Sequence, residues 1–128
     1  MKLCIECDKP LINSASIFCS RKCSFINRYR QEKINAMIAL DNGTLSDINA
    51  RRWFRKVTQP VCSICGLDSW LGKSIPLVVD HIDGNHNNNR KDNLRMICCN
   101  CDAQLPTYKG ANKGNGRKAR LDKLRQSR

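Results

Sequence analysis

The sequence contains the stretch Val79-Asp80-His81-Ile82-Asp83-Gly84-Asn85-His86-Asn87-Asn88-Asn89-Arg90. A short apolar run from Ile75 to Val79 leads into it, and the residues then become abruptly polar. This change is typical of the end of a β-strand, where functional side chains are presented to solvent. We therefore expect Asp80 and His81 side by side at a strand end. Hydrolysis of a phosphodiester needs a divalent cation and a base, and a carboxylate beside a histidine can supply both functions.

Two Cys-x-x-Cys pairs enclose this stretch, with Cys62 and Cys65 before it and Cys98 and Cys101 after it. Four thiolates with this spacing are typical of a structural zinc site. One zinc ion would hold both ends of the loop that carries Asp80 and His81. We leave Cys99 outside the set because Cys98 and Cys101 have the two-residue gap that zinc sites use.

The features that extend this pattern lie between about Pro60 and Lys113. They are Cys62-Ser63-Ile64-Cys65-Gly66, Trp70, Val79 to Asn85, Asn88-Asn89, Asn93-Leu94-Arg95, Cys98 to Cys101 and Thr107-Tyr108. Together they resemble the zinc-braced HNH endonucleases that are common in bacteriophages. The resemblance implies a ββα-metal fold, in which two short strands and a helix clasp one catalytic divalent cation, Mg²⁺ or Mn²⁺.

The same resemblance implies roles for individual residues. His81 matches the general base of the family, Asp80 its metal-binding carboxylate, and Asn93 the middle Asn that braces the loop. The chain departs from the family at Asp102, where a His usually follows the last zinc cysteine. A carboxylate suits a hard cation such as Mg²⁺, so we expect Asp102 to be a metal ligand. The alternative is that Asp102 is the N-cap of a helix.

The composition favours metal stabilisation over a large core. The chain has 128 residues, nine cysteines and only 5% aromatic residues, so burial alone offers limited stability. No signal peptide precedes Cys4, and the cysteines fall in close pairs, which favours zinc in a reducing cytoplasm over disulfides. No apolar run is long enough to cross a bilayer, and we therefore expect a soluble protein.

A second set of four cysteines lies near the N-terminus: Cys4, Cys7, Cys19 and Cys23. We interpret it as a separate zinc finger. The spacing of its second pair resembles small FCS-x-x-C fingers, in which the last cysteine begins a helix. Two roles stay open for the finger: a structural staple for the N-terminus, or direct recognition of bases.

Two helices are predicted between the cysteine sets. The first runs from Ser20 to about Leu40 and ends at Asn42-Gly43, and the second begins after Ser46. The second has an apolar face of Ala50, Trp53, Phe54 and Val57 and a basic face of Arg51, Arg52, Arg55 and Lys56. We expect no acidic partner nearby for i,i+4 pairing with this basic face, and we therefore predict that it contacts phosphates.

The charge of the chain indicates a polyanionic partner. It contains 23 Lys and Arg against 11 Asp and Glu, a net charge of +12, which favours nucleic acid. After Tyr108 the residues become mostly Gly, Asn, Lys and Arg, as in a flexible basic tail that orders on phosphate. The tail residues expected to bind DNA are Arg117, Lys118 and Arg120.

These observations predict a small zinc-stabilised α+β protein in four segments. They are an N-terminal zinc finger (1–24), a basic helical connector (25–59), an HNH nuclease module (60–108) and a basic tail (109–128). The predicted function is metal-dependent hydrolysis of DNA, by nicking or by double-strand cleavage. The alternative is a non-catalytic nucleic-acid-binding zinc protein that keeps the HNH scaffold.

We expect two structural zinc ions, one catalytic divalent cation, DNA as partner and no membrane. A homodimer is expected if both strands are cut. The expected location is the cytoplasm of a bacterium infected by a phage.

Overall fold

The computed structural model describes residues 1–108, 121 and 124–126. The predicted tail residues Arg117, Lys118 and Arg120 lie outside these residues. The chain divides into two compact units, Met1–Ile38 and Ala39–Arg128. The four-segment division stays a prediction. None of the helices in the described part is long and apolar enough to cross a membrane.

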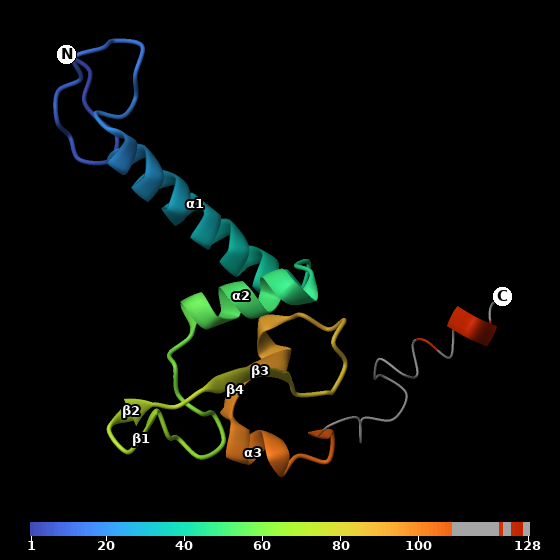
Figure 1. Ribbon diagram of the computed structural model, residues 1–128. Helices are drawn as coiled ribbons and strands as arrows, with labels where there is room; N and C mark the ends of the chain where they lie inside the picture. The colour runs from blue at the N-terminus through green and yellow to red at the C-terminus, as the bar shows by residue number, and fades with distance from the viewer. Residues whose placement is uncertain (109–120, 122–123, 127–128) are drawn as a thin grey trace. The chain divides into compact units, whose positions relative to one another are not determined.

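The first unit consists of a looped N-terminal segment and most of helix α1 (Arg21–Asn42), which begins two residues before Cys23 (Figure 1). The predicted helix is confirmed. Arg30 ties it to the loop, because its guanidinium donates to both carboxylate oxygens of Glu6 at 2.9 and 2.7 Å. Several apolar side chains of α1, among them Phe25 and Ile34, are exposed.

The predicted end of α1 is also confirmed. Thr44 N donates to Ala39 O at 3.0 Å and Gly43 N donates to Leu40 O at 3.2 Å, which is the Schellman arrangement. Gly43 has a φ of +69°, a conformation that favours glycine. The chain therefore turns sharply at this point and enters the next helix.

Helix α2 (Asp47–Val57) begins after Ser46, as predicted, and buries Ala50, Trp53 and Phe54. Ser46 occupies the N-cap position without a side-chain bond to the helix. Its carbonyl accepts from Ala50 N at 2.8 Å and so starts the helical ladder. Figure 1 shows α2 alongside β3, with which it is in contact.

The remaining elements form the predicted ββα arrangement, and the α+β fold class is confirmed. Strand β3 (Leu77–His81) pairs antiparallel with β4 (Leu94–Cys98), which follows the short helix η1 (Lys91–Asn93) and leads into α3 (Cys99–Ala103). Strand β3 begins two residues after Ile75, the start of the predicted apolar run. A core of Cys62, Ile97 and Cys98 lies where the strand pair meets the second cysteine set.

A small hairpin of β1 (Ser69–Trp70) and β2 (Lys73–Ser74) precedes β3. Trp70 lies on it with 63% of its surface exposed. Leu71 and Gly72 form the two-residue turn with φ of +50° and +76°. The hairpin strands have only two residues each and both are exposed, so they offer no buried face for the indole.

Candidate active site and zinc centres

Each predicted cysteine set comes together in space. Within each set the four sulfur atoms lie within 4.8 Å of one another. In the first set Cys7 and Cys19 are 3.5 Å apart, and in the second Cys65 and Cys98 are 3.8 Å apart. Zn–S bonds of ~2.3 Å in a tetrahedron place sulfur atoms about 3.8 Å apart. Both sets could therefore hold zinc, and all nine cysteines are free thiols.

The same backbone turn shapes both sets. Gly66 N donates to Cys62 O, and Asp8 N donates to Cys4 O, both at 2.9 Å. Gly66 and Asp8 have φ of +75° and +58°, so the turn requires a left-handed residue directly after the second cysteine. In the second set Cys98 N also donates to Cys62 Sγ at 3.3 Å, which joins the turn to β4.

The thiols of the second set differ in acidity. Burial raises the pKa of Cys62, but hydrogen bonds from the backbone of Cys65, Cys98 and Ile64 outweigh it and bring the pKa to about 6. Burial and hydrogen bonds with Cys98 and Cys62 raise the pKa of Cys101 to about 12. Zinc must displace the protons that remain, so zinc binding to this set should weaken as the pH falls.

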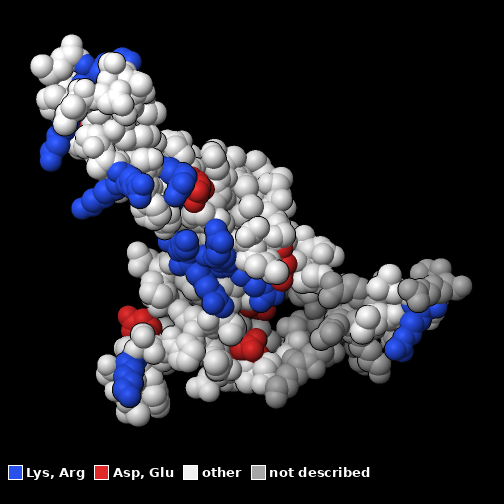
Figure 2. Space-filling model, turned by 45° about the horizontal axis from the view of Figure 1, so that its top comes forward, with Lys and Arg blue, Asp and Glu red and all other residues white. Residues whose placement is uncertain are grey.

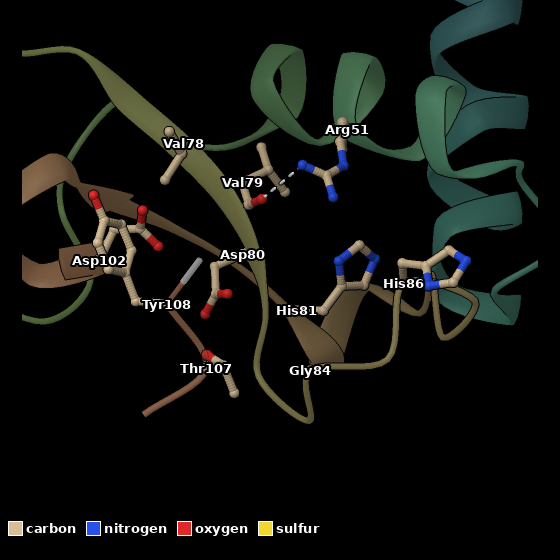
Figure 3. Close-up of a pocket in the computed structure, with 10 residues that line it drawn as sticks. All are labelled: Arg51, Val78, Val79, Asp80, His81, Gly84, His86, Asp102, Thr107 and Tyr108. Carbon is tan, nitrogen blue, oxygen red and sulfur yellow. Dashed lines mark hydrogen bonds between the residues drawn. The ribbon is translucent and has the colours of Figure 1, made fainter. Parts of the chain in front are cut away.

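The predicted residues Asp80, His81 and Asp102 line one cavity of about 440 Å³ in the second unit. Figure 3 shows Asp80 and His81 projecting from β3, Asp102 from α3, and Arg51 from α2. The full lining is Arg51, Val78, Val79, Asp80, His81, Gly84, His86, Asp102, Thr107 and Tyr108. The cavity thus combines two carboxylates, two imidazoles and one guanidinium.

Asp80 and Asp102 supply the carboxylates of this cavity. Asp80 pairs across the strands with Arg95, whose Nε donates to Asp80 Oδ2 at 2.8 Å. Asp102 is the fourth residue of α3, and the N-cap of that helix is Cys98. The alternative that Asp102 caps the helix is therefore wrong, because the helix begins immediately after Cys98. Two carboxylates on facing elements are a suitable donor set for a hard divalent cation.

His81 is almost fully buried, with 6% of its surface exposed. Its Nε2 lies 2.9 Å from Asn89 Oδ1 and 3.6 Å from Asp47 Oδ1. Arg51 donates from Nε to Asp47 Oδ1 at 2.8 Å and from Nη1 to Val79 O at 3.3 Å. The expectation that Arg51 has no acidic partner is therefore wrong.

Asn93 joins the ends of the loop between β3 and β4. Its Nδ2 donates to Asp83 Oδ1 at 2.9 Å and to Asn88 O at 2.8 Å, and its Oδ1 accepts from Asp83 N at 3.1 Å. Hydrogen bonds from Asn88, the Asn85 backbone and Asn93 lower the pKa of Asp83 against the opposing effect of burial, with help from nearby His81. The ionised Asp83 carboxylate thus organises the loop together with Asn93.

Sequence reasoning missed Asp47, Asp83 and Asn89 as neighbours of the site. Asp47 stands four residues before Arg51, a spacing that predicts an ion pair on a helix. Asp83 lies two residues after His81, within the polar stretch that ends at Arg90. The contact of Asn89 with His81 joins a loop residue to a strand residue, and no local pattern indicates it.

The rest of the basic face of α2 is exposed. Arg52 and Lys56 lie over the Trp53 ring, with their charged groups 5.6 and 4.7 Å from its centroid. Arg55 is exposed as well. In Figure 2, Lys and Arg side chains gather in the middle of the view, where α2 lies.

Comparison with known proteins gives one match. The chain is 57% identical over 53 residues to an H-N-H endonuclease, F-TflIV, of Escherichia phage T5. The matched segment is 41% of this chain and 23% of the relative, so the chain spans less than a quarter of the relative's length. No family model and no solved structure matches the chain. Over the matched segment, the resemblance predicted from the sequence is confirmed.

Proposed function

From its likeness to a phage H-N-H endonuclease, we propose that this chain hydrolyses DNA phosphodiester bonds with the help of a divalent cation. The observation that carries the proposal is the cavity that Asp80, His81 and Asp102 line together, within the ββα arrangement. Asp80 and His81 come from β3 and Asp102 from α3, and these are the side chains that the proposed chemistry requires.

Each of the three residues has a distinct role in the proposed reaction. Asp80 and Asp102 would hold Mg²⁺ or Mn²⁺, which when bound would neutralise charge that develops on the scissile phosphate. His81 takes a proton from the attacking water. Asn93 keeps the loop between β3 and β4 in place through its bonds to Asp83 and Asn88, so that His81 stays oriented.

Positive charge on α2 and in the tail would hold the DNA. Arg52, Arg55 and Lys56 are exposed on α2, while Arg51 points into the cavity. We propose that the first three, with Arg117, Lys118 and Arg120 of the tail, contact phosphates on either side of the reacting one. The relative's description as an endonuclease supports DNA as the substrate.

Cleavage of supercoiled plasmid by the full, zinc-loaded chain tests the proposal. Cleavage is expected with added Mg²⁺ or Mn²⁺ and none without it. His81→Ala should bind DNA and metal nearly as well as the wild type but cut at least ~10²-fold more slowly, the usual scale for losing a positioned base. Asp80→Ala should instead bind the catalytic cation more weakly while both zinc ions remain.

The competing function is DNA binding without cleavage, because Asp102 replaces the usual His of the family. Tight, salt-dependent binding with no cleavage at any Mg²⁺ or Mn²⁺ concentration would favour that function. Full cleavage by His81→Ala would instead defeat the proposed mechanism. The sizes of the products separate nicking from double-strand cleavage, and the latter would call for a dimer.

A further inference from the structure

Asn89 is buried beside His81, with 5% of its surface exposed. Its amide has two different partners: Nδ2 lies 3.1 Å from the carbonyl oxygen of Leu45, and Oδ1 lies 2.9 Å from His81 Nε2. A backbone carbonyl only accepts hydrogen bonds, so the NH₂ group of Asn89 must face Leu45. The amide oxygen must then face the imidazole, and this oxygen also only accepts.

A second acceptor lies on the same side of the ring. Asp47 Oδ1 is 3.6 Å from His81 Nε2, and Arg51 Nε holds this carboxylate at 2.8 Å. A neutral imidazole has one protonated nitrogen and one with a free electron pair. Because Nε2 faces two acceptors, it carries the proton, and Nδ1 keeps the electron pair. In Figure 3 one ring nitrogen of His81 is on the side of Asp80 and the other on the side of His86.

We propose that Asn89 is a positioning residue that fixes the tautomer and orientation of His81, so that Nδ1 is the nitrogen that takes the proton. This inference rests on the proposed function, in which His81 is the general base. Water transfers one proton to Nδ1 as its oxygen bonds to phosphorus. The bond from phosphorus to the leaving oxygen breaks, and that oxygen keeps the electron pair and is protonated by solvent. The imidazolium that forms still donates from Nε2 to Asn89.

Nuclear magnetic resonance of the ring nitrogens tests the tautomer without any cleavage. The sample is the full, zinc-loaded chain with ¹⁵N-labelled histidine, at a pH where the ring is neutral and without Mg²⁺ or DNA. The chain has two histidines, so His86→Gln identifies the signals. The wild type should show the His81 proton on Nε2, protected from solvent exchange and close to Asn89. A proton on Nδ1 would overturn the proposal.

Two neighbouring asparagines provide matched variants. Asn89→Ala should lose the protected Nε2 proton signal to solvent exchange. Asn88→Ala should keep this signal. Asn88 neighbours Asn89 in the same loop, but its side chain donates to Asp83, at 2.8 Å. A protected Nε2 proton in Asn89→Ala would show that Asn89 does not hold the ring and would also overturn the proposal.

Kinetics then separate positioning from loop stability. Asn89→Ala should lower kcat at saturating DNA and Mg²⁺ by on the order of 10- to 100-fold, the scale for losing a partner that orients a functional histidine, with little change in KM. Asn89→Asp keeps an acceptor oxygen and should recover part of the loss. Equal losses in Asn88→Ala and Asn89→Ala would overturn the proposal. If the wild type does not cut at all, the proposed function fails, while the ring spectra still decide the tautomer.

Discussion

Asp102 projects from the first turn of α3 into the cavity that contains Asp80. A capping residue would lie before the helix, where its oxygen could accept from the first free backbone N–H groups. Cys98 occupies that position instead and is also a member of the second cysteine set. Because Asp102 directly follows Cys101, zinc bound by the second set would also fix the position of the proposed ligand Asp102.

Replacing Asp102 tests whether it is a metal ligand. Loss of a partner that only orients a metal ligand lowers metal affinity or activity by about 10- to 100-fold. Loss of a ligand itself should have a larger effect, so Asp102→Ala should reduce cleavage at limiting Mg²⁺ by at least ~10²-fold. Asp102→His restores a metal-binding side chain and should retain or raise activity. Asp92→Ala is the control, because Asp92 is 73% exposed and pairs with Arg90. Full cleavage by Asp102→Ala at saturating Mg²⁺ would refute the ligand role.

Helix α2 carries basic residues with two different environments. Arg51 is half-buried at the cavity, where it pairs with Asp47 and donates to the β3 backbone. Arg55 is exposed. An exposed arginine that contacts a phosphate releases about one counterion from the DNA. An arginine that already pairs with a carboxylate should release fewer counterions when DNA binds.

The variants Arg51→Gln and Arg55→Gln should therefore fail in different ways. Arg55→Gln should weaken binding to all DNA sequences and reduce the slope of log K against log salt by about 1. Arg51→Gln should change this slope less but lower the cleavage rate at saturating DNA more, because Asp47 and the wall of the cavity lose their partner. Fluorescence anisotropy over a salt series measures the first effect, and single-turnover cleavage the second. Identical salt slopes in both variants and the wild type would show that the DNA does not contact this face of α2.

At the scale of the whole molecule, each compact unit contains one set of four cysteines. Structural zinc contributes ~10–16 kcal/mol of apparent binding free energy in small zinc domains, which is free energy of folding. In the second unit Cys62 and Cys98 are themselves part of a buried cluster with Ile97, so we expect zinc binding there to stabilise the packing of that unit. Loss of one ion should then affect one unit far more than the other.

Elemental analysis of the purified chain should find two zinc ions. Cys65→Ser and Cys7→Ser should each retain about one, and amide exchange should rise mainly in Ala39–Arg128 for Cys65→Ser and mainly in Met1–Ile38 for Cys7→Ser. Cys99→Ser is the control and should keep both ions, because Cys99 lies outside the two sets. One zinc in the wild type, or a disulfide among the eight cysteines, would contradict this division.

Local patterns in the sequence determined the cysteine sets and the ends of several helices and strands. Cysteine spacing predicted both sets, the Asn42-Gly43 pair predicted the end of α1, and the switch at Asp80 predicted a strand end. These features depend on backbone turns and on residues a few positions apart, so they can be read from neighbours along the chain. Resemblance to HNH endonucleases supplied the expectation that Asp102 belongs with Asp80.

Only the tertiary structure decided how distant residues share the site. It placed Arg51 at the cavity, exposed Trp70 on a hairpin too short to bury it, and put Asn89 between Leu45 and His81. The last arrangement includes a hydrogen bond between Asn89 and Leu45, which are 44 positions apart in the sequence. Such contacts follow from the packing of α2 and the loop against β3, and packing between separate elements has no period or spacing in the sequence from which it could be read.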